Sequence, residues 1–366
     1  MAATFEHSHP IPRVTSSALP FTQRAVLVHD RKTVALETIP LDRPGLGQVL
    51  VKNSVIAQNP GDWKAREWDL GILRSTRGFG YDFAGRIAAL GEGVTGWKVG
   101  DRVAGYVMPV KATKIAQNAY CEYTVAAVNP LIRIPDNISD EEAATIPLAA
   151  FTSLHLLNIV VDIPKRAPLG GRALLIWGGS SSLGQFAIQL AHIAGYKVIT
   201  TASPRNHVLV KSLGAAVAID YHAPDVVEQI IAASGRDGVD YAYDAIAENG
   251  STEFASKTLR KDGPRKVAVV IPLDVSNLDP SVDHYYSTPV SFLDHDIEFA
   301  GLYIPRNRAE LALGIDFAEN ATGWLKEGRL KPSPFTVRPG GLSGVQDGLD
   351  FMKAGKVRAA AAAAGV

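Results

Sequence analysis

The sequence lacks several features that mark particular classes of protein. Its 366 residues include one cysteine, Cys121, which excludes an internal disulfide and a zinc site built from several cysteines. Lysine and arginine (37 together) balance aspartate and glutamate (37 together). Without a broad positive field, a nucleic-acid-binding protein is not expected. No apolar run approaches the ~20 residues of a membrane span, so no membrane association is expected either.

The composition is that of an ordinary folded protein, with 46% hydrophobic and 20% charged residues. At ~150 residues per domain, the length favours two domains. Residues 1–21 contain no apolar stretch, so we expect a flexible leader rather than a signal peptide. The protein is expected to be cytoplasmic.

The first part of the chain, from about residue 24 to 146, is rich in short β-strand patterns. Turn signals separate them, among them Asn59-Pro60-Gly61. Many short strands at this spacing indicate a partly open barrel or small sandwich. Ser139 and Glu142 have the spacing of a capping box, which predicts the start of a helix.

Beyond residue 150, strand and helix patterns alternate. Arg172–Trp177, Tyr196–Thr201 and Ala216–Ile219 are predicted strands, and apolar periodicity predicts a helix over Gln185–Ala194. This alternation indicates βαβ units and a parallel sheet covered on both faces. The sequence therefore predicts an α/β class, with a β-rich domain joined to a doubly wound parallel sheet.

The most informative segment follows the strand Arg172–Trp177. It contains Gly178, Gly179, Ser180, Ser181, Ser182 and Leu183, and then Gly184. A glycine turn that opens a helix brings backbone amides to the helix N-terminus, where an anion is stabilised. Serines stand at two positions where glycines are usual, and their hydroxyls would donate to phosphate. The alternative is a plain strand-to-helix turn.

The end of the second strand selects the nicotinamide cofactor. An acid there binds the ribose 2′-hydroxyl of NAD, whereas a cation without an acid suits the 2′-phosphate of NADP. Ser203 and Arg205 follow Thr201 with no carboxylate between them. Tyr221, after the third strand, would complete the adenine side. We predict NADPH; the alternative is a solvated helix N-terminus with an incidental arginine.

Several further short motifs follow one another along the chain. They are Asn59–Asp62, Gly80–Gly85, Gly91–Val94, Val99–Val103 and Gly340–Leu342. In this order, the chain resembles the medium-chain dehydrogenase/reductase superfamily. The strings Leu175–Ser182 and Thr200–Asn206 are similar to its fungal zinc-free branch, which includes trans-acting enoyl reductases.

The resemblance implies a GroES-like domain over residues 22–149, completed by 295–366, around a Rossmann domain over 150–294. It implies that Gly341 and Leu342 contact the cofactor, and that Lys64, Asn59 and Thr152 lie near the nicotinamide as catalytic residues. Trp63, Tyr81 and Tyr303 would line the substrate site. The alternatives are that Lys64 is a surface lysine, that the Thr152 hydroxyl is an ordinary helix hydroxyl, and that the aromatic residues belong to the core. The tail Ala359–Ala364 would bury little surface as a strand.

The resemblance also indicates whether the protein binds a catalytic zinc ion. At the positions of the catalytic zinc ligands the chain has Asn59 and Tyr81, so no metal is expected. The expected activity is NADPH-dependent hydride transfer to an activated C=C bond of a small molecule, free or carried by a polyketide synthase. Such a protein would serve fungal secondary metabolism as a monomer or homodimer. A quinone reductase and an NADPH-binding module with little catalysis remain alternatives, and a zinc alcohol dehydrogenase fits poorly.

Overall fold

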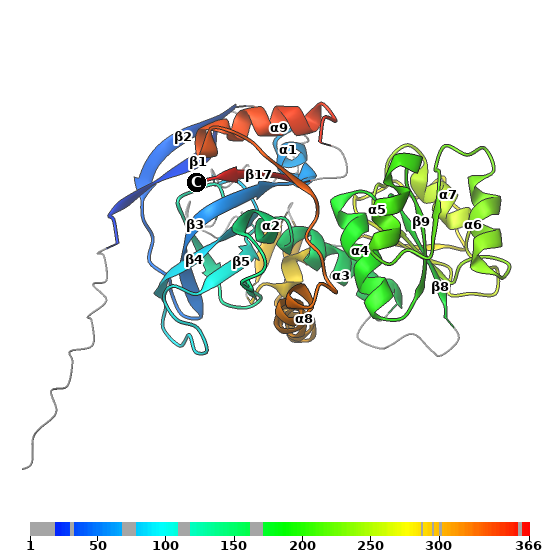
Figure 1. Cartoon of the computed structure of the whole chain (residues 1–366), viewed down its shortest axis with the longest axis horizontal. Helices are drawn as coiled ribbons and strands as arrows, with labels where there is room; N and C mark the ends of the chain where they lie inside the picture. Colours follow the sequence, from blue (N-terminus) through cyan, green and yellow to red (C-terminus); the bar gives the residue numbers. More distant parts are fainter. Residues whose placement is uncertain are drawn as a thin grey trace, which may run out of the picture.

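The structure is a computed structural model with two lobes that lie side by side (Figure 1). It describes residues 19–29, 33–67, 78–108, 118–161, 171–286, 288–294, 296–299, 302–357 and 361–366. Most of the predicted leader, residues 1–18, lies outside the described residues.

The first lobe is built on a seven-stranded sheet. Its order is β16-β17-β3-β4-β5-β7, and β6 pairs with β3. A separate antiparallel hairpin, β1–β2, joins Thr22–His29 to Thr33–Pro40. The sheet strands are β3 (Gln48–Gln58), β4 (Asp82–Leu90), β5 (Arg102–Tyr106), β6 (Tyr123–Ala127), β7 (Ile132–Arg133), β16 (Phe335–Val337) and β17 (Ala361–Gly365). Alternate side chains of β3, including Val49 and Val51, are buried in the core beneath β1.

The C-terminal strand returns to this first sheet. β17 pairs antiparallel with β3 and parallel with β16. Ala361–Ala364 are buried, contrary to the expectation that this tail would bury little. The reason is that the helices α2 (Asp140–Ala144) and α9 (Val345–Lys353) and the turn η4 (Gly341–Gly344) pack against the strand.

The second lobe is a six-stranded parallel sheet with the order β10-β9-β8-β11-β12-β13. In chain order this is 3-2-1-4-5-6, the arrangement of dinucleotide-binding folds. The predicted α/β class is confirmed. The strands are β8 (Ala173–Trp177), β9 (Lys197–Thr201), β10 (Val217–Ile219), β11 (Tyr241–Asp244), β12 (Lys266–Val269) and β13 (Asp283–Tyr286).

Helices cover both faces of this sheet. All five side chains of β8 are buried, which is possible only when both faces of the sheet are covered. Leu174 and Ile176 share a core with α4 (Ser182–Ile193) and α5 (His207–Ser212). Leu175 and Trp177 face the opposite core, with α6 (Val226–Ser234) and α7 (Ser251–Lys257). A short 3-10 helix, η2 (Pro204–Asn206), precedes α5.

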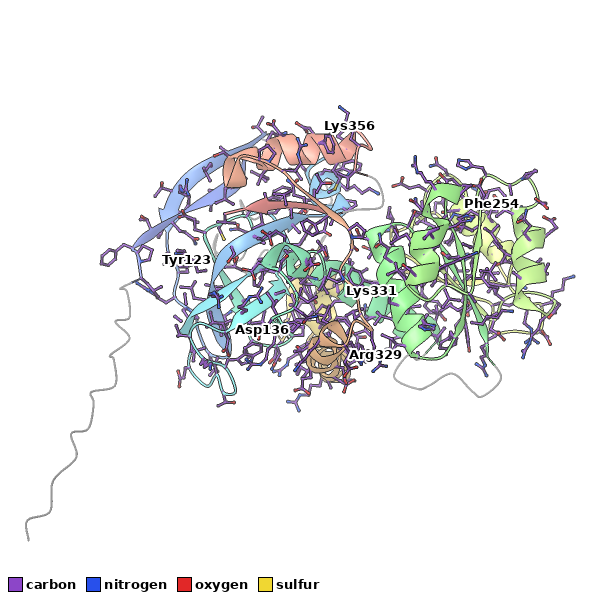
Figure 2. All side chains as sticks on the ribbon, in the orientation of Figure 1. Tyr123, Asp136, Phe254, Arg329, Lys331 and Lys356 are labelled. Atoms are coloured by element: carbon purple, nitrogen blue, oxygen red, sulfur yellow. The ribbon has the colours of Figure 1, made fainter. Side chains whose placement is uncertain are left out.

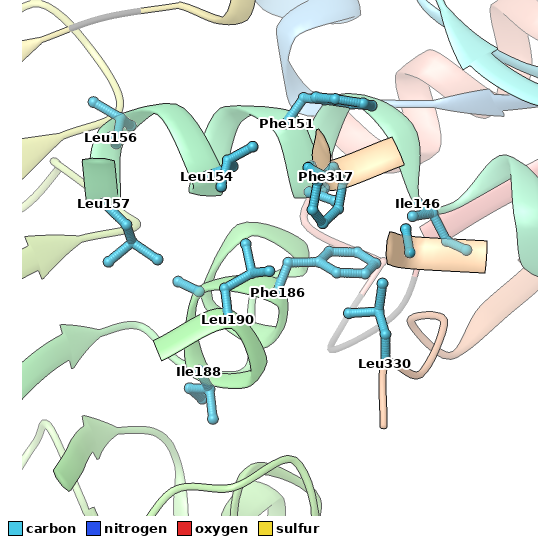
Figure 3. Packing of buried hydrophobic residues seen from close by; sticks show 14 of the residues in the cluster. Ile146, Phe151, Leu154, Leu156, Leu157, Phe186, Ile188, Leu190, Phe317 and Leu330 are labelled. Carbon is cyan, nitrogen blue, oxygen red and sulfur yellow. The ribbon is translucent and has the colours of Figure 1, made fainter. Parts of the chain in front are cut away.

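The helix α3 (Pro147–Val161) joins the lobes and crosses the predicted boundary at residue 150. Figure 3 shows its Phe151 next to Phe317 of α8 (Arg308–Lys326), above Phe186 of α4. The stretch Asp140–Val161 is long and apolar enough to cross a membrane, which the sequence analysis missed, yet 78% of its most apolar window is buried inside the protein. Its apolar character is therefore that of a core helix.

The remaining elements lie around this junction. The turn η3 (Pro289–Phe292) accepts a hydrogen bond at the Pro289 carbonyl from the Tyr106 hydroxyl (2.6 Å). The strands β14 (Ile297–Phe299) and β15 (Leu302–Ile304) form a hairpin before α8. Beyond α8, Lys331 passes beside α4 (Figure 2), where its amide donates to the Gln189 side chain (2.7 Å).

Candidate active site

The loop between β8 and α4 requires glycine at several positions. A Cβ at Gly184 would lie 2.3 Å from the Gly178 carbonyl oxygen and 2.7 Å from the Gly179 Cα. A Cβ at Gly179 would lie 2.0 Å from the Thr200 hydroxyl oxygen. Gly178 itself has a φ of 78°, which favours glycine. The loop backbone therefore lies directly against the helix and the neighbouring strand.

Ser181 holds the start of α4. Its hydroxyl accepts from the Gly184 amide (3.0 Å) and donates to the Gly178 carbonyl (2.9 Å). This hydroxyl proton is therefore engaged, contrary to the expectation that it would donate to phosphate. The amides of Ser182 and Leu183, in the first turn, have no acceptor within the helix. Ser180, Ser182 and Leu183 are half-buried.

The end of β9 is tied to this loop. The Gly178 amide donates to the Thr201 hydroxyl (3.0 Å), and the Gly179 amide donates to the Thr201 carbonyl (2.9 Å). Ser203 follows at the N-cap of η2 without a side-chain capping bond. Arg205 is exposed, and in the described part of the chain its guanidinium pairs with no carboxylate.

These features fit a nicotinamide dinucleotide. Free amides at a helix N-terminus suit a pyrophosphate, and the adjacent hydroxyl and guanidinium suit a further phosphate. Tyr221 lies just past β10, 43% exposed, with its ring 3.9 Å from that of His222. The planes of the two rings are inclined at 34° to each other.

Gly341 and Leu342 are not brought to this loop. Their turn, η4, packs against β1, β2, β17 and α9 in the first lobe. The Leu342 side chain is buried in the core of that lobe, where it contributes to folding. The contact of Gly341 and Leu342 with the cofactor stays a prediction.

A helix occupies the position where a turn was predicted at Asn59-Pro60-Gly61. α1 (Pro60–Glu67) has proline at its first position, where the missing amide costs nothing. The Asp62 carboxylate accepts from the Asn59 amide (2.7 Å) and from the Tyr120 hydroxyl (2.7 Å). The turn signal was thus the start of a helix.

Asn59 also connects two buried carboxyl groups. Its side-chain amide donates to Asp82 (2.8 Å), whose other oxygen accepts from the Leu148 amide (2.8 Å). Burial raises the pKa of Asp62 to about 7 and that of Asp82 to about 8, although their hydrogen bonds act in the opposite direction. Asn59 is therefore held by two acids, of which Asp82 is mostly protonated and Asp62 about half protonated at neutral pH.

Lys64, on α1, forms an ion pair with Glu248 of the other lobe. Its ammonium also lies 5.6 Å from the centre of the Trp63 ring, and Trp63 packs against the first core. Thr152 is half-buried on α3. Its neighbour Ser153 donates to the Leu183 carbonyl (2.9 Å), which brings this part of α3 against the phosphate loop.

The two tyrosines predicted to line the substrate site differ in how far they are exposed to solvent. Tyr81 is 5% exposed and belongs to the core that connects the lobes. Burial, with smaller contributions from Asp62 and Tyr286, raises its pKa far above the usual range. Tyr303 is 67% exposed and donates to Asp296 (2.9 Å) within its own hairpin.

The donor set does not fit a zinc ion. Among the residues with a described position, no three His, Cys, Asp or Glu side chains are grouped to hold a metal. The Cys121 thiol donates to the carbonyls of Asn118 and Tyr123 (3.1 and 3.0 Å), and burial raises its pKa to about 12. A thiol in this state is a poor metal ligand, because ligation requires the thiolate.

Sequence reasoning missed the loop after β11. The buried Asp244 carboxylate accepts from the amides of Ile246 and Ala247 and from the hydroxyls of Ser251 and Thr252 (2.6–3.0 Å). The available signal in the sequence was an acid at the end of a predicted strand, Asp244, followed seven and eight residues later by Ser251 and Thr252. This loop carries Glu248.

Together, the fold and this site define a two-domain nucleotide-dependent oxidoreductase. Family models match in both parts: the alcohol dehydrogenase GroES-like domain over residues 45–136 and the zinc-binding dehydrogenase domain over 182–278. The chain belongs to the medium-chain dehydrogenase/reductase superfamily, as the resemblance indicated.

Several relatives match over nearly the whole chain. A trans-enoyl reductase of Penicillium citrinum is 33% identical over 92% of this chain and 96% of its own. A zinc-type alcohol dehydrogenase-like protein of Schizosaccharomyces pombe is 32% identical over 91% and 97%. Among solved structures, the CurK enoyl reductase matches with a TM-score of 0.73 at 19% identity, covering 94% of this chain and 99% of its own. A quinone oxidoreductase of Coxiella burnetii matches with a TM-score of 0.70 at 23% identity, covering 94% and 99%.

Proposed function

We propose that the protein is a zinc-independent, NADPH-dependent reductase of activated carbon–carbon double bonds. The observation that carries the cofactor assignment is the end of β9, where Ser203 and Arg205 are available and no carboxylate intervenes. The trans-enoyl reductases among the relatives support the reaction type. We further propose a cytoplasmic role in fungal secondary metabolism, as a monomer or homodimer, on a small substrate free or bound to a polyketide synthase carrier.

Each part of the chain has a distinct task in this scheme. The amides of Ser182 and Leu183 would hold the pyrophosphate, and Ser203 with Arg205 would hold the 2′-phosphate. When bound, NADPH would supply a hydride to the β carbon of an enone or enoyl thioester. Negative charge would then develop on the substrate carbonyl oxygen, and a proton delivered to the α carbon would complete the reduction. The Lys64 ammonium would donate a hydrogen bond to this oxygen, and Asn59 and Thr152 would lie near the nicotinamide.

The cofactor assignment is tested by Arg205→Ala. Loss of a charged hydrogen bond to the 2′-phosphate should weaken NADPH binding by roughly 1.5–3 kcal/mol, or about 10- to 150-fold in Kd. Calorimetric titration with NADPH and with NADH measures both affinities. Arg308→Ala, at an exposed arginine on α8, is the matched control and should change neither. Equal losses for the two nucleotides in Arg205→Ala would refute the 2′-phosphate assignment.

The reaction is tested by NADPH oxidation with a set of enones and enoyl thioesters beside a set of quinones. A quinone reductase is the second candidate, because quinone oxidoreductases share the fold. Turnover of quinones alone would establish that candidate and remove the enoyl-reductase proposal. Tight NADPH binding without turnover of either set would favour a binding module. Elemental analysis finding stoichiometric zinc would overturn zinc independence.

A further inference from the structure

The loop after β11 has a fixed shape that is costly to form. Ala247 and Asn249 have φ values of 54° and 56°. Asparagine adopts this conformation readily, but alanine does so at an energetic cost. Four hydrogen bonds to the buried Asp244 carboxylate hold the loop in place. Backbone held in such a conformation is typical of functional sites. Glu248 lies between these two positive-φ residues and directly follows the strained Ala247.

Glu248 reaches across the domain boundary. Its carboxylate contacts the Lys64 ammonium on α1, and the two side chains are 46% and 15% exposed. The carboxylate is half-exposed, but the lysine side chain is largely buried, so Glu248 supplies a counter-charge to an ammonium that is mostly removed from water. The contact also orients the lysine, because a lysine side chain is flexible and loses its freedom only when a partner holds it.

We propose that Glu248 is a positioning residue for Lys64: it holds the ammonium where the substrate carbonyl oxygen is to be stabilised. This inference rests on the proposed role of Lys64 in enoyl reduction. The carboxylate and the lysine come from different domains, so the pair forms only when the domains are assembled. Glu248 would act through the geometry and charge of Lys64 and not by touching the substrate.

The other charged groups around α1 are already paired. Arg66 contacts Glu67 and Asp350 (2.9 Å each), and Lys353 of α9 contacts Glu67 (2.9 Å). Asp62, two residues before Lys64, is buried and has a raised pKa of about 7. Within the described part of the chain, the Glu248 carboxylate forms an ion pair with the Lys64 ammonium.

The first experiment is a double-mutant cycle on kcat with Lys64→Gln and Glu248→Gln. A misplaced catalytic group costs up to about 100-fold in rate, so we expect Glu248→Gln alone to lower kcat about 10- to 100-fold, with NADPH affinity unchanged. In the Lys64→Gln background the same change should have less than about a twofold effect, because residues acting as a unit are non-additive. Additive losses would overturn the proposal.

A matched control lies on the adjacent helix. Glu253→Gln removes an exposed carboxylate that pairs with Lys257 (2.6 Å), and kcat should stay as in the wild type. Urea unfolding of Glu248→Gln measures how much the pair contributes to stability. A large loss of stability accompanied by an unchanged KM and pH profile would mean that the pair is structural.

The second experiment needs no turnover, so it separates this inference from the proposed function. The Lys64 NMR signal is recorded with lysine labelled at Cε, at one fixed pH, in wild type and Glu248→Gln. Loss of the ion pair changes the surroundings of the ammonium, so the Lys64 signal should move in Glu248→Gln, while Glu253→Gln leaves it unchanged. An unaltered Lys64 signal would refute the positioning contact. If the Lys64 signal moves as expected but the wild type reduces no alkene, the proposed function fails and the contact stands.

Discussion

Substitution of Gly184 by alanine tests the phosphate loop most directly. Gly184 is the third residue of α4, and its missing Cβ leaves room for the loop to fold back onto the helix. The added Cβ would lie 2.3 Å from the Gly178 carbonyl oxygen and 2.7 Å from the Gly179 Cα. Both obstacles are backbone atoms, so no side-chain rotation relieves the clash. The loop must move away from the helix by about an ångström to restore ordinary contact.

The expected cost combines two effects of opposite sign. Alanine inside a helix is favoured over glycine by ~1 kcal/mol, whereas overpacking of this kind costs typically 1–3 kcal/mol or more. Displacement of the loop would also disturb the amide bonds of Gly178 and Gly179 to Thr201, each worth ~1 kcal/mol. We expect a net loss of ~1–3 kcal/mol in the free energy of unfolding, with NADPH affinity at least about tenfold weaker.

Urea unfolding and calorimetric titration with NADPH measure the two quantities. Gly323→Ala is the matched control, since Gly323 lies within α8 and a Cβ there would meet nothing within 4 Å. That variant should be more stable by up to ~1 kcal/mol and should bind NADPH normally. If Gly184→Ala also gained stability and retained its affinity, the loop would not hold the cofactor as described.

Two further predictions concern the first domain. Folding raises the pKa of Asp62 from 3.8 to about 7, so the folded state holds an extra proton between these values and stability falls as the pH rises from about 4 to 7. Asp62→Asn should flatten that decline in urea unfolding at pH 5 and pH 8, and parallel profiles would contradict the raised pKa. Ser139 accepts from the Glu142 amide (3.1 Å) as the N-cap of α2, so Ser139→Ala should lower the free energy of unfolding by ~1 kcal/mol. An unchanged urea midpoint would show that the cap contributes nothing.

Local patterns predicted much of the second domain. The strand-loop-helix unit was predicted from the continuous apolar run before Gly178 and the helical periodicity after Ser182. A strand that is buried on both faces has no position for a polar side chain, so its sequence is continuously apolar. The capping box at Ser139 is confirmed because both of its hydrogen bonds are between near neighbours. Such features depend on residues a few positions apart, which a sequence displays directly.

Features set by distant residues were missed. The turn signal at Asn59-Pro60-Gly61 became a helix because Asp62 is held by Tyr120, 58 positions away. The burial of Leu342 was not predicted, because its position is fixed by packing against strands at the other end of the chain. Glu248 carries no recognisable pattern, since its partner lies 184 positions earlier.

The two domains share one continuous core, and this determines how the site residues are held. Buried side chains run from Ala84 and Ala104 of the first sheet, through Phe151 of α3, to Ile176 and Phe186 of the second domain. Polar contacts reinforce the junction where Tyr106 meets Pro289 and where Ser153 meets Leu183. A large apolar interface disfavours free domain motion. The Lys64–Glu248 pair therefore lies at the edge of a fixed junction, where a change in one carboxylate alters the position of the lysine and leaves the fold intact.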